Sequence, residues 1–341
     1  MRKGHQQPTI KDVALIAGVS IQTVSAVLNQ KPGITEATAK RVHEAVQRVG
    51  YEPYSIARSL RTRATQTIAL IISDIANPSF SVMASAAERS ALALGYNLVF
   101  YNTHDDSDRE IACIRAAAQR WVDGILIVSA EDRLPSYEAL LATGIHFVPI
   151  ERVPLHYSGP SVTFNNIEAG RIAARHLLDL GHTRVAHISG PMKLAPARAR
   201  CEGFQLEIAA RNLPACQCID GGGNWDCLSG YEAMRHVLET RPRPTGIFCA
   251  NDRIALGAML AASEASLSVP GDLSVVGLDN IEVSQYHVPP LTTITQPFAR
   301  TATEALRLLF DLIQGRKPEP GVVVLEPELV VRGSTGPAPG D

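Results

Sequence analysis

The residues near the start of the chain that could do chemistry lie within one short segment, residues 20–29. At helical spacing, one face of this segment carries small and polar side chains, where a solvent-facing helix would usually carry Lys and Glu. The members of this face are Ile21, Gln22, Ser25, Ala26 and Asn29. Short side chains fit into the major groove of DNA, and an amide such as that of Gln22 pairs with the edge of adenine. The pattern therefore predicts a helix that reads DNA bases, with an ordinary helical hairpin in a small bundle as the alternative.

The elements that would position this face are two short helices and the turn between them. Thr9 and Asp12 have the spacing of a capping box and predict the start of the first helix. Gly18 allows a sharp turn, and Ser20 is a favoured cap for the second helix. With a third helix after Thr35, the segment is expected to form a compact three-helix module.

The distribution of charge supports a nucleic-acid partner for this module. Residues 1–65 hold ten Lys and Arg against four Asp and Glu, whereas the other 276 residues hold 22 against 30. A basic head on an acidic body attracts the phosphate backbone, and its binding should weaken steeply as salt rises.

On these residues the segment resembles the headpiece of the LacI-type family of bacterial transcription regulators, which includes the lactose and purine repressors. The resemblance extends to about Arg332. It implies an α/β fold class, with an all-α helix-turn-helix headpiece and a two-lobed, periplasmic-binding-protein-like core of doubly wound parallel sheets. It also implies a regulator, expected to be a repressor, that grips a palindromic operator in double-stranded DNA as a homodimer under control of a small effector. The headpiece residues expected at the DNA are Thr9, Ser20, Ile21, Gln22, Thr23, Ser25, Ala26 and Asn29.

One of these positions departs from a common family pattern. Many members carry an arginine where this chain has Ala26, and arginine would pair with guanine, whereas Ala26 can only touch a thymine methyl. Ile21 has the same apolar option. Thr23, Ser25 and Asn29 are expected to contact the DNA backbone, which sets the register without reading sequence. The operator half-site should therefore differ from those of the arginine type.

Residues 53–65 resemble the family's hinge, which orders on DNA and places a leucine in the minor groove. Leu60 occupies the position of that leucine, with Ala57 beside it. An apolar wedge of this kind unstacks a base step and kinks the duplex. Arg58 is expected at the phosphates or in the narrow groove. Without the resemblance, the residues themselves favour a charged linker between domains.

From Gln66 onward, short apolar runs alternate with helical stretches, which is typical of α/β proteins with parallel sheets. About 270 residues are too many for one such sheet, so two lobes facing a cleft are predicted. The resemblance implies three crossings between the lobes, placed near residues 160, 291 and 322. The expected domains are a headpiece (1–52), a hinge (53–65), a core (66–335) and a disordered tail (336–341). Within the core, the N-lobe takes 66–160 and 292–321, and the C-lobe takes 161–291 and 322–335.

Eight residues match family positions around the effector, and the resemblance implies that they line the cleft. They are Ser79, Phe80, Glu151, Phe164, Arg200, Trp225, Asn251 and Asp279. An aromatic face with an arginine, an amide and a carboxylate suits a polar ring compound, with a sugar or sugar derivative first and a purine or nucleoside second. Other interpretations stay open: Arg200 and Asp279 could merely pair with one another, Trp225 could cover a lobe edge, and the two phenylalanines could be core.

Enzyme function is not expected, because the chain has neither a Walker sequence nor a Gly-x-Ser-x-Gly elbow. No cofactor and no metal site are expected, since the histidines are irregularly placed and no Cys-x-x-Cys pair is present. All six cysteines, including Cys216 and Cys218, are interpreted as reduced. We expect no export signal, no membrane partner and a cytoplasmic, nucleoid-associated location, which argues against an exported sugar-binding protein. No leucine heptads follow residue 333, so a dimer is expected in place of a tetramer.

Overall fold

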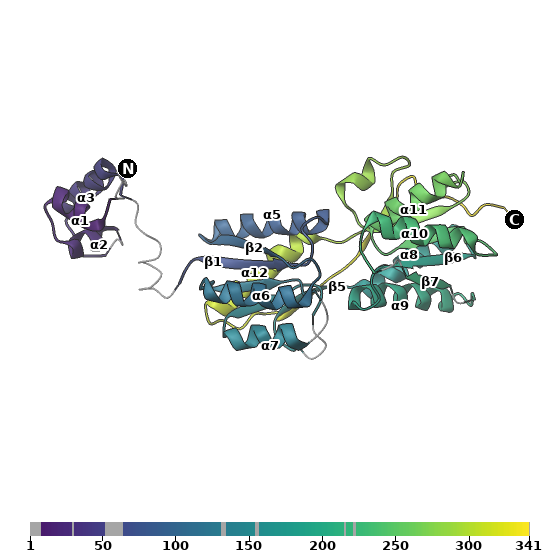
Figure 1. Ribbon diagram of the computed structural model, residues 1–341, viewed down its shortest axis with the longest axis horizontal. Coiled ribbons are helices and arrows are strands. Elements are labelled where there is room, and N and C mark those ends of the chain that lie inside the picture. Colours follow the sequence, from purple (N-terminus) through teal and green to yellow (C-terminus); the bar gives the residue numbers. More distant parts are fainter. Residues whose placement is uncertain are drawn as a thin grey trace, which may run out of the picture. The chain divides into compact units, whose positions relative to one another are not determined.

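The structure is a computed structural model that describes residues 8–28, 31–51, 64–130, 134–153, 157–214, 216–220 and 223–340. The chain divides into two compact units, 1–65 and 66–341, each of which is described by itself (Figure 1). We call the first unit the head and the second the core.

Within its described residues, the head contains the three predicted helices: α1 (Ile10–Ala17), α2 (Ile21–Leu28) and α3 (Glu36–Val49). The expected capping box is present, because Asp12 Oδ2 accepts hydrogen bonds from Thr9 N–H at 2.7 Å and from Thr9 Oγ1 at 2.8 Å. Gly18 adopts φ 64°, the left-handed conformation that the sharp turn requires. The axes of α1 and α2 are bent by 102°, within the range of helix-turn-helix motifs. Three fully buried valines fill the centre of the head: Val13, Val24 and Val42.

The N-lobe of the core is a parallel sheet in the order β2-β1-β3-β4, packed with helices. The strands are β1 (Thr67–Ile72), β2 (Asn97–Asn102), β3 (Gly124–Ile127) and β4 (His146–Pro149). The helices are α5 (Pro78–Ala93), α6 (Ser107–Gln119), α7 (Leu134–Thr143) and α12 (Phe298–Ile313). Asn77 and Asp106 cap α5 and α6 by accepting from Ser79 N–H and Arg109 N–H, so polar side chains cluster where the strands end.

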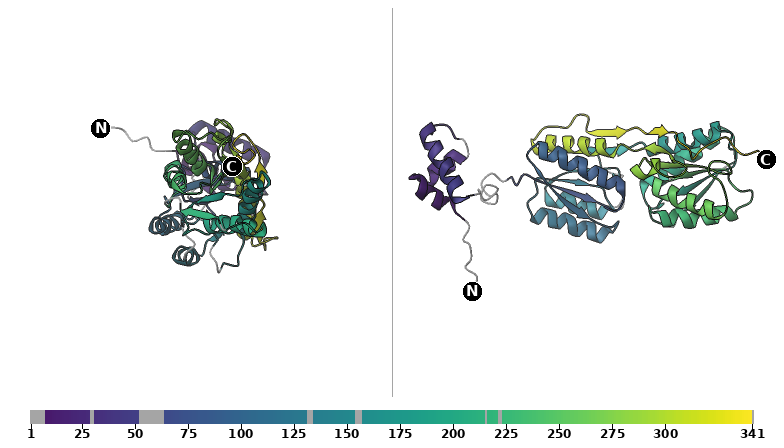
Figure 2. Two further views of the ribbon diagram at one scale, coloured as in Figure 1. Left: turned by 90° about the vertical axis from the view of Figure 1, so that its right-hand side faces the viewer. Right: turned by 90° about the horizontal axis from the view of Figure 1, so that it is seen from above.

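The C-lobe is built around a sheet in the order β12-β10-β9-β8-β6-β7, parallel except for β12. Its strands are β6 (Val185–Ser189), β7 (Gln217–Asp220), β8 (Gly246–Cys249), β9 (Ser274–Asp279), β10 (Thr292–Thr295) and β12 (Glu328–Val330). Its helices are α8 (Asn166–Asp179), α9 (Ala195–Ala210), α10 (Cys227–Glu239), α11 (Asp252–Glu264) and the short 3-10 helix η1 (Glu282–Gln285). Figure 2 shows the two lobes side by side, each with helices packed around its own sheet, and the yellow C-terminal part of the chain running along both.

The crossings between the lobes lie a few residues later than expected. The predicted second crossing, near residue 291, is wrong, because Thr292–Thr295 forms β10 and pairs in parallel with β9 of the C-lobe. The strands β5 (Ser161–Phe164) and β11 (Val322–Leu325) pair with each other as a two-stranded sheet. A bridge from Ile150 to Val162 attaches β5 to the end of β4. Apolar runs mark strands but do not show which sheet a strand joins, which explains the error.

The predicted disordered tail at 336–341 is also wrong for the residues that the structure describes. Ala338 N–H donates to Leu180 O at 2.9 Å, and Gly336 N–H donates to Ser274 Oγ at 3.0 Å. The Gly336 carbonyl lies 3.1 Å from His182 Nε2. A Gly/Pro-rich composition therefore does not prevent this segment from packing on the C-lobe, because its backbone groups find fixed partners there.

Two general features of the described residues bear on the class of protein. No single helix among them is long and apolar enough to cross a membrane, and α1 with α2 reaches that length and hydropathy only as the pair bent by 102°. No cluster of three or more His, Cys, Asp or Glu side chains within these residues is arranged to hold a metal ion.

Candidate nucleic-acid interface and effector site

The outer face of α2 is available for a partner. Ile21 is 44% exposed and Gln22 is exposed, whereas Val24 and Val27 on the opposite face are buried in the head. Ala26 is half-buried, so this position presents only a methyl group at the surface. The arrangement matches the prediction of a small, polar helix face that could enter a groove.

The start of α2 is fixed by hydroxyl groups. Thr23 N–H donates to Ser20 Oγ at 3.1 Å, and the hydroxyls of Ser20 and Thr23 are hydrogen-bonded at 2.9 Å. These two residues, with Thr9 at the start of α1, anchor the helix N-termini, where backbone N–H groups can meet phosphates. The predicted DNA contacts Asn29, Ala57, Arg58 and Leu60 lie outside the described residues.

A small cavity lies between the lobes of the core, at the carboxyl ends of strands from both. Six of the eight predicted effector residues line it: Phe80, Glu151, Arg200, Trp225, Asn251 and Asp279. Five further residues line it that sequence reasoning missed: Asn77, Arg152, Pro196, Gln296 and Phe298. The site therefore forms where open α/β sheets bind ligands.

Arg200 is the centre of this site. It is 4% exposed, and its guanidinium donates through Nε to Asn166 Oδ1 at 2.7 Å and through Nη1 to the Ala250 carbonyl at 2.6 Å. Its Nη2 donates to Gln296 Oε1 at 3.1 Å. The guanidinium donates its hydrogen bonds to these three acceptors and not to Asp279. The alternative in which Arg200 merely pairs with Asp279 is therefore not what the structure shows.

Trp225 covers one side of Arg200. The Arg200 Cζ atom lies 5.4 Å from the centroid of the indole, which is the distance of a cation–π contact. The indole also packs against Gly190, where a Cβ would clash with ring atoms Cζ3 and Cη2. The indole Nε1 is buried and makes no hydrogen bond within the described residues. A buried donor of this kind can be satisfied by a polar ligand.

Two hydrogen-bonded links join the lobes at the cavity. Ser79 Oγ, on α5 of the N-lobe, donates to Asp279 Oδ2 at the end of β9 in the C-lobe, at 3.2 Å. Gln296, just after β10, donates through Nε2 to Glu151 Oε1 at the end of the N-lobe strand β4. Glu151 and Asp279 both have positive φ values, of 61° and 118°. Such strained backbone is concentrated at functional sites.

Burial controls the electrostatics of the cluster. It raises the pKa of Asp279 well above its usual range, and the Arg200 guanidinium only partly opposes this effect. It raises the pKa of Glu151 as well, against the pull of Arg200 and Arg152. Arg152 itself is tied to Asp105 at 2.7 Å. A ligand with several hydroxyls would satisfy these carboxyls and the guanidinium at once.

The cavity is narrow in this structure. Its volume is about 30 Å³, which is room for roughly two water molecules. A second, outer cavity of about 270 Å³ shares Asn77, Phe80 and Trp225 with it and is otherwise polar, with Asp74 and Arg253 paired at 3.5 Å. A ring compound would therefore need Phe80, Trp225 or the lobes themselves to move.

Two predicted effector residues have other positions. Phe164 is buried in the hydrophobic core and does not line the cavity, which agrees with the alternative that it is a core residue. Ser79 does not line it either, but holds Asp279. Asn251 lines the cavity and also caps α11, because its Oδ1 accepts from Ile254 N–H at 2.8 Å while its Nδ2 donates to the Trp225 carbonyl. Gln296 could have been found only by placing β10 in the correct sheet.

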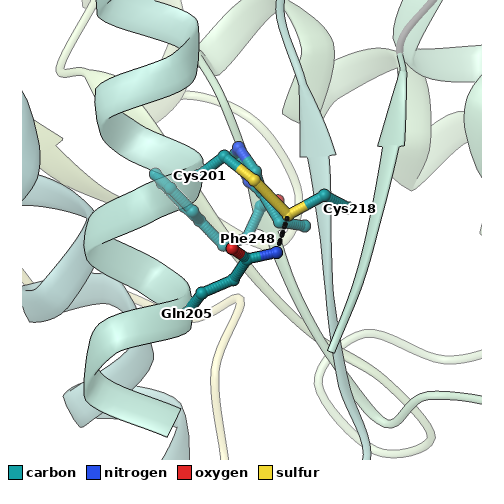
Figure 3. The surroundings of a disulfide bond; sticks show 5 residues. Cys201, Gln205, Cys218 and Phe248 are labelled. Carbon is teal, nitrogen blue, oxygen red and sulfur yellow. Dashed lines mark hydrogen bonds between the residues drawn. A yellow bond between two sulfur atoms is a disulfide. The ribbon is translucent and has the colours of Figure 1, made fainter. Parts of the chain in front are cut away.

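The expectation that all six cysteines are reduced is wrong for this structure. Cys201 on α9 and Cys218 on β7 form a disulfide, with Cα atoms 6.7 Å apart (Figure 3). The other four cysteines are free thiols. Spacing in a sequence can indicate only pairs of neighbouring cysteines, whereas this pair is 17 residues apart and meets because α9 packs on the sheet that contains β7.

Comparisons with known proteins agree with the fold. Residues 9–54 match bacterial regulatory proteins of the lacI family, and residues 174–335 match a periplasmic binding protein-like domain. The HTH-type transcriptional repressor PurR of Actinobacillus pleuropneumoniae is 36% identical over 328 residues, covering 96% of this chain and 98% of the relative. The ribose operon repressor of Escherichia coli K12 is 35% identical over 327 residues, covering 96% and 99%.

A solved structure shows the same architecture. The lac repressor dimer, bound to operator and the anti-inducer ONPF, superposes with a TM-score of 0.88 at 29% identity and covers 97% of this chain and 100% of its own. The head, the two-lobed core and these relatives lead to one conclusion: the chain belongs to the lacI family and is a DNA-binding transcriptional repressor, not an enzyme.

Proposed function

We propose that this repressor binds a palindromic operator as a homodimer in the cytoplasm, and that a small polyhydroxylated ligand between the lobes controls its grip on DNA. The observation that carries the ligand proposal is the position of Arg200. Its buried guanidinium is held by Asn166, Ala250 and Gln296 and lies over the Trp225 ring. A sugar or sugar derivative suits this combination of an aromatic surface with charged hydrogen-bonding groups.

The links between the lobes explain how occupancy would reach the DNA. Ser79–Asp279 and Gln296–Glu151 hold the lobes together around a cavity that is too small for a ring. A ligand must replace or rearrange these links, so binding changes the relation between the lobes. A coupling of about 1–3 kcal/mol would change operator affinity by about 5- to 150-fold.

Apolar side chains on the surface of the core support a homodimer. Val82 and Leu92 on α5 and Leu228 and Leu260 on α10 and α11 are each more than half exposed. Leu228 and Leu260 also line a common, mainly apolar groove, and exposed apolar side chains that form a contiguous patch usually mark a protein interface. The lac repressor structure with which this chain superposes is a dimer bound to operator, and a second copy of this chain is the partner we expect.

A purine or nucleoside is the second candidate effector, because Phe80, Phe298 and Trp225 provide aromatic surfaces for a planar ring. Calorimetric titration with a panel of pentoses, hexoses, purine bases and nucleosides distinguishes the two. We expect a sugar to bind wild type and to lose its binding in Arg200→Ala. Saturable binding of a purine alone would replace the sugar proposal, and product analysis after titration would expose any turnover.

Operator binding needs its own experiment. Mapping of bound sites across the genome should return an inverted repeat, with half-sites about one turn of DNA apart. The Leu60→Ala variant should lose specific binding much more than nonspecific binding, because an apolar wedge acts only at the operator centre. Equal losses would reject the wedge. A bound motif without two-fold symmetry would reject the dimeric mode.

A further inference from the structure

The disulfide between Cys201 and Cys218 connects the two elements that place Arg200 and Trp225. Cys201 directly follows Arg200 on α9, and Cys218 lies on β7, the strand that leads to the loop carrying Trp225. The side chains of Arg200 and Trp225 meet in the cavity, where Arg200 Cζ lies 5.4 Å from the centroid of the indole. Figure 3 shows the bond that joins the helix and the strand. One covalent bond therefore ties together the two elements that support the cation–π pair.

The two supports differ in how firmly the rest of the fold holds them. Helix α9 packs closely on α8, since a Cβ at Gly203 would clash with the Ile167 carbonyl. Among the described residues, strand β7 lies at the edge of its sheet and has β6 as its single neighbour. Apart from the disulfide, Gln205 Nε2 donates to Cys218 Sγ at 3.4 Å. Loss of the covalent tie should thus affect β7 and the Trp225 loop more than α9.

We propose that Cys201 and Cys218 are a redox modification site, through which a disulfide of the glutathione class alters the effector cavity. Cys218 is half-buried and is therefore more accessible than Cys201, which is only 6% exposed. The Cys218 thiol attacks the small disulfide and releases one glutathione thiol. The Cys201 thiol then attacks the mixed disulfide, so the protein gains the Cys201–Cys218 bond and a second glutathione thiol leaves. The protein loses two electrons and two protons, and the small disulfide gains both.

The environment of Cys216 and Cys249 supports selectivity for the Cys201–Cys218 pair over these two thiols. Burial raises the pKa of Cys216 to about 11, so its thiol is almost entirely protonated near neutral pH, although it is two residues from Cys218. Burial raises the pKa of Cys249 further still. Because thiolates react and thiols do not, proximity to Cys218 alone does not make Cys216 a competitor.

The first experiment tests the chemistry without any effector. The full-length protein is equilibrated in buffers of reduced and oxidised glutathione, alkylated, digested and analysed by mass spectrometry. Oxidation should protect Cys201 and Cys218 together and yield one peptide pair joined by them, in wild type and equally in the control Cys216→Ser. The Cys218→Ser variant should leave Cys201 alkylated. Full alkylation of both cysteines in every buffer, or a bond through Cys216, would overturn the proposal.

The second experiment tests the effect on the cavity. In a Trp121→Phe background Trp225 is the sole tryptophan, so acrylamide quenching reports its accessibility. Quenching should be greater in the reduced protein than in the oxidised protein, and Cys218→Ser should match the reduced form in both buffers. Identical quenching in both redox states would show that the bond does not influence the cavity, and would also overturn the proposal.

The consequence for regulation rests on the proposed function. A sugar that binds in the panel titration should bind about 5- to 150-fold more tightly to the oxidised form, and by linkage it should favour disulfide formation by the same factor. Equal affinities for the two forms would remove the regulatory role. Failure of every sugar to bind would reject the effector proposal, while the alkylation and quenching results would still decide the redox site.

Discussion

Ser79 and Asp279 meet across the boundary between the lobes, where the Ser79 hydroxyl donates to Asp279 Oδ2 at 3.2 Å. The two residues are 200 positions apart in the chain, and each lies at the end of an element of its own lobe. Asn77 fixes the first turn of α5 and with it the position of Ser79. The same hydrogen bond therefore contributes to the structure of the site and to the association of the lobes.

Ser79→Ala should weaken this association. The variant leaves the buried Asp279 carboxyl without its hydroxyl donor, so the free energy of unfolding of the core should fall by about 1 kcal/mol. Hydrogen exchange should increase at the start of α5 and after β9. The control is Ser81→Ala, on the same helix, whose hydroxyl donates to Ile75 O within one lobe. If both variants show the same exchange pattern, the link does not hold the lobes together.

Gly190→Ala should displace the indole of Trp225. The added methyl group would occupy the space of ring atoms, and the buried side chains around it leave little room. We expect altered Trp225 fluorescence in a Trp121→Phe background and effector binding at least about tenfold weaker, which corresponds to roughly 1.4 kcal/mol. Gly321→Ala is the matched control, because its nearest contact would be an ordinary 3.7 Å. Unchanged fluorescence and affinity would show that the ring position is not important for binding.

Local signals predicted much of what positions these sites. The capping box of Thr9 and Asp12, the turn at Gly18 and the buried run of β1 depend on neighbouring residues and are present in the structure. Arg200 and Trp225 were found because their motifs match family positions, and the structure brings both to one cavity. Short-range chemistry and motif matching were sufficient at these points.

Features that depend on which sheet or helix a segment meets could not be predicted in this way. Gln296 is one example, because it follows β10, and the apolar run of β10 does not show that this strand joins β9 in the C-lobe. The Cys201–Cys218 pair spans a helix and an edge strand, and nothing in the spacing of 17 residues indicates that they meet. Gly336 and Ala338 are ordered by partners on the C-lobe rather than by their own conformational preferences.

His187 should make the stability of the C-lobe depend on pH. Its ring stacks on Phe248 at 4.6 Å, and burial lowers its pKa to about 4. Because the unfolded chain takes up this proton near pH 6.5, the stability contribution is complete above that pH and is lost as the pH falls toward 4. The difference between these pKa values corresponds to roughly 3 kcal/mol.

Buried carboxyls change the stability in the opposite direction as the pH falls; one of them is Asp252, whose pKa burial raises to about 6. These groups are the same in wild type and His187→Phe, so the difference in stability between the two proteins isolates the effect of His187. Urea unfolding at pH 7 and pH 5 should show wild type losing more stability than His187→Phe. Phe204→Leu, beside the same ring, removes packing without a titrating group, so its difference from wild type should be equal at both pH values. Parallel losses in all three proteins would contradict the prediction.

Gln22→Ala should change which base the repressor prefers. Gln22 is exposed on the outer face of α2 beside Ile21, where an amide can pair with adenine in the major groove. Loss of such a pair costs about 1–3 kcal/mol at one position of the half-site, so site selection from random duplexes should return a motif relaxed at that position alone. Gln47→Ala, on the exposed surface of α3, has the same chemistry on a different helix and should keep the wild-type motif. If Gln22→Ala also keeps that motif, base reading falls to Ile21 and Ala26, and the recognition helix discriminates through apolar contacts with thymine methyls.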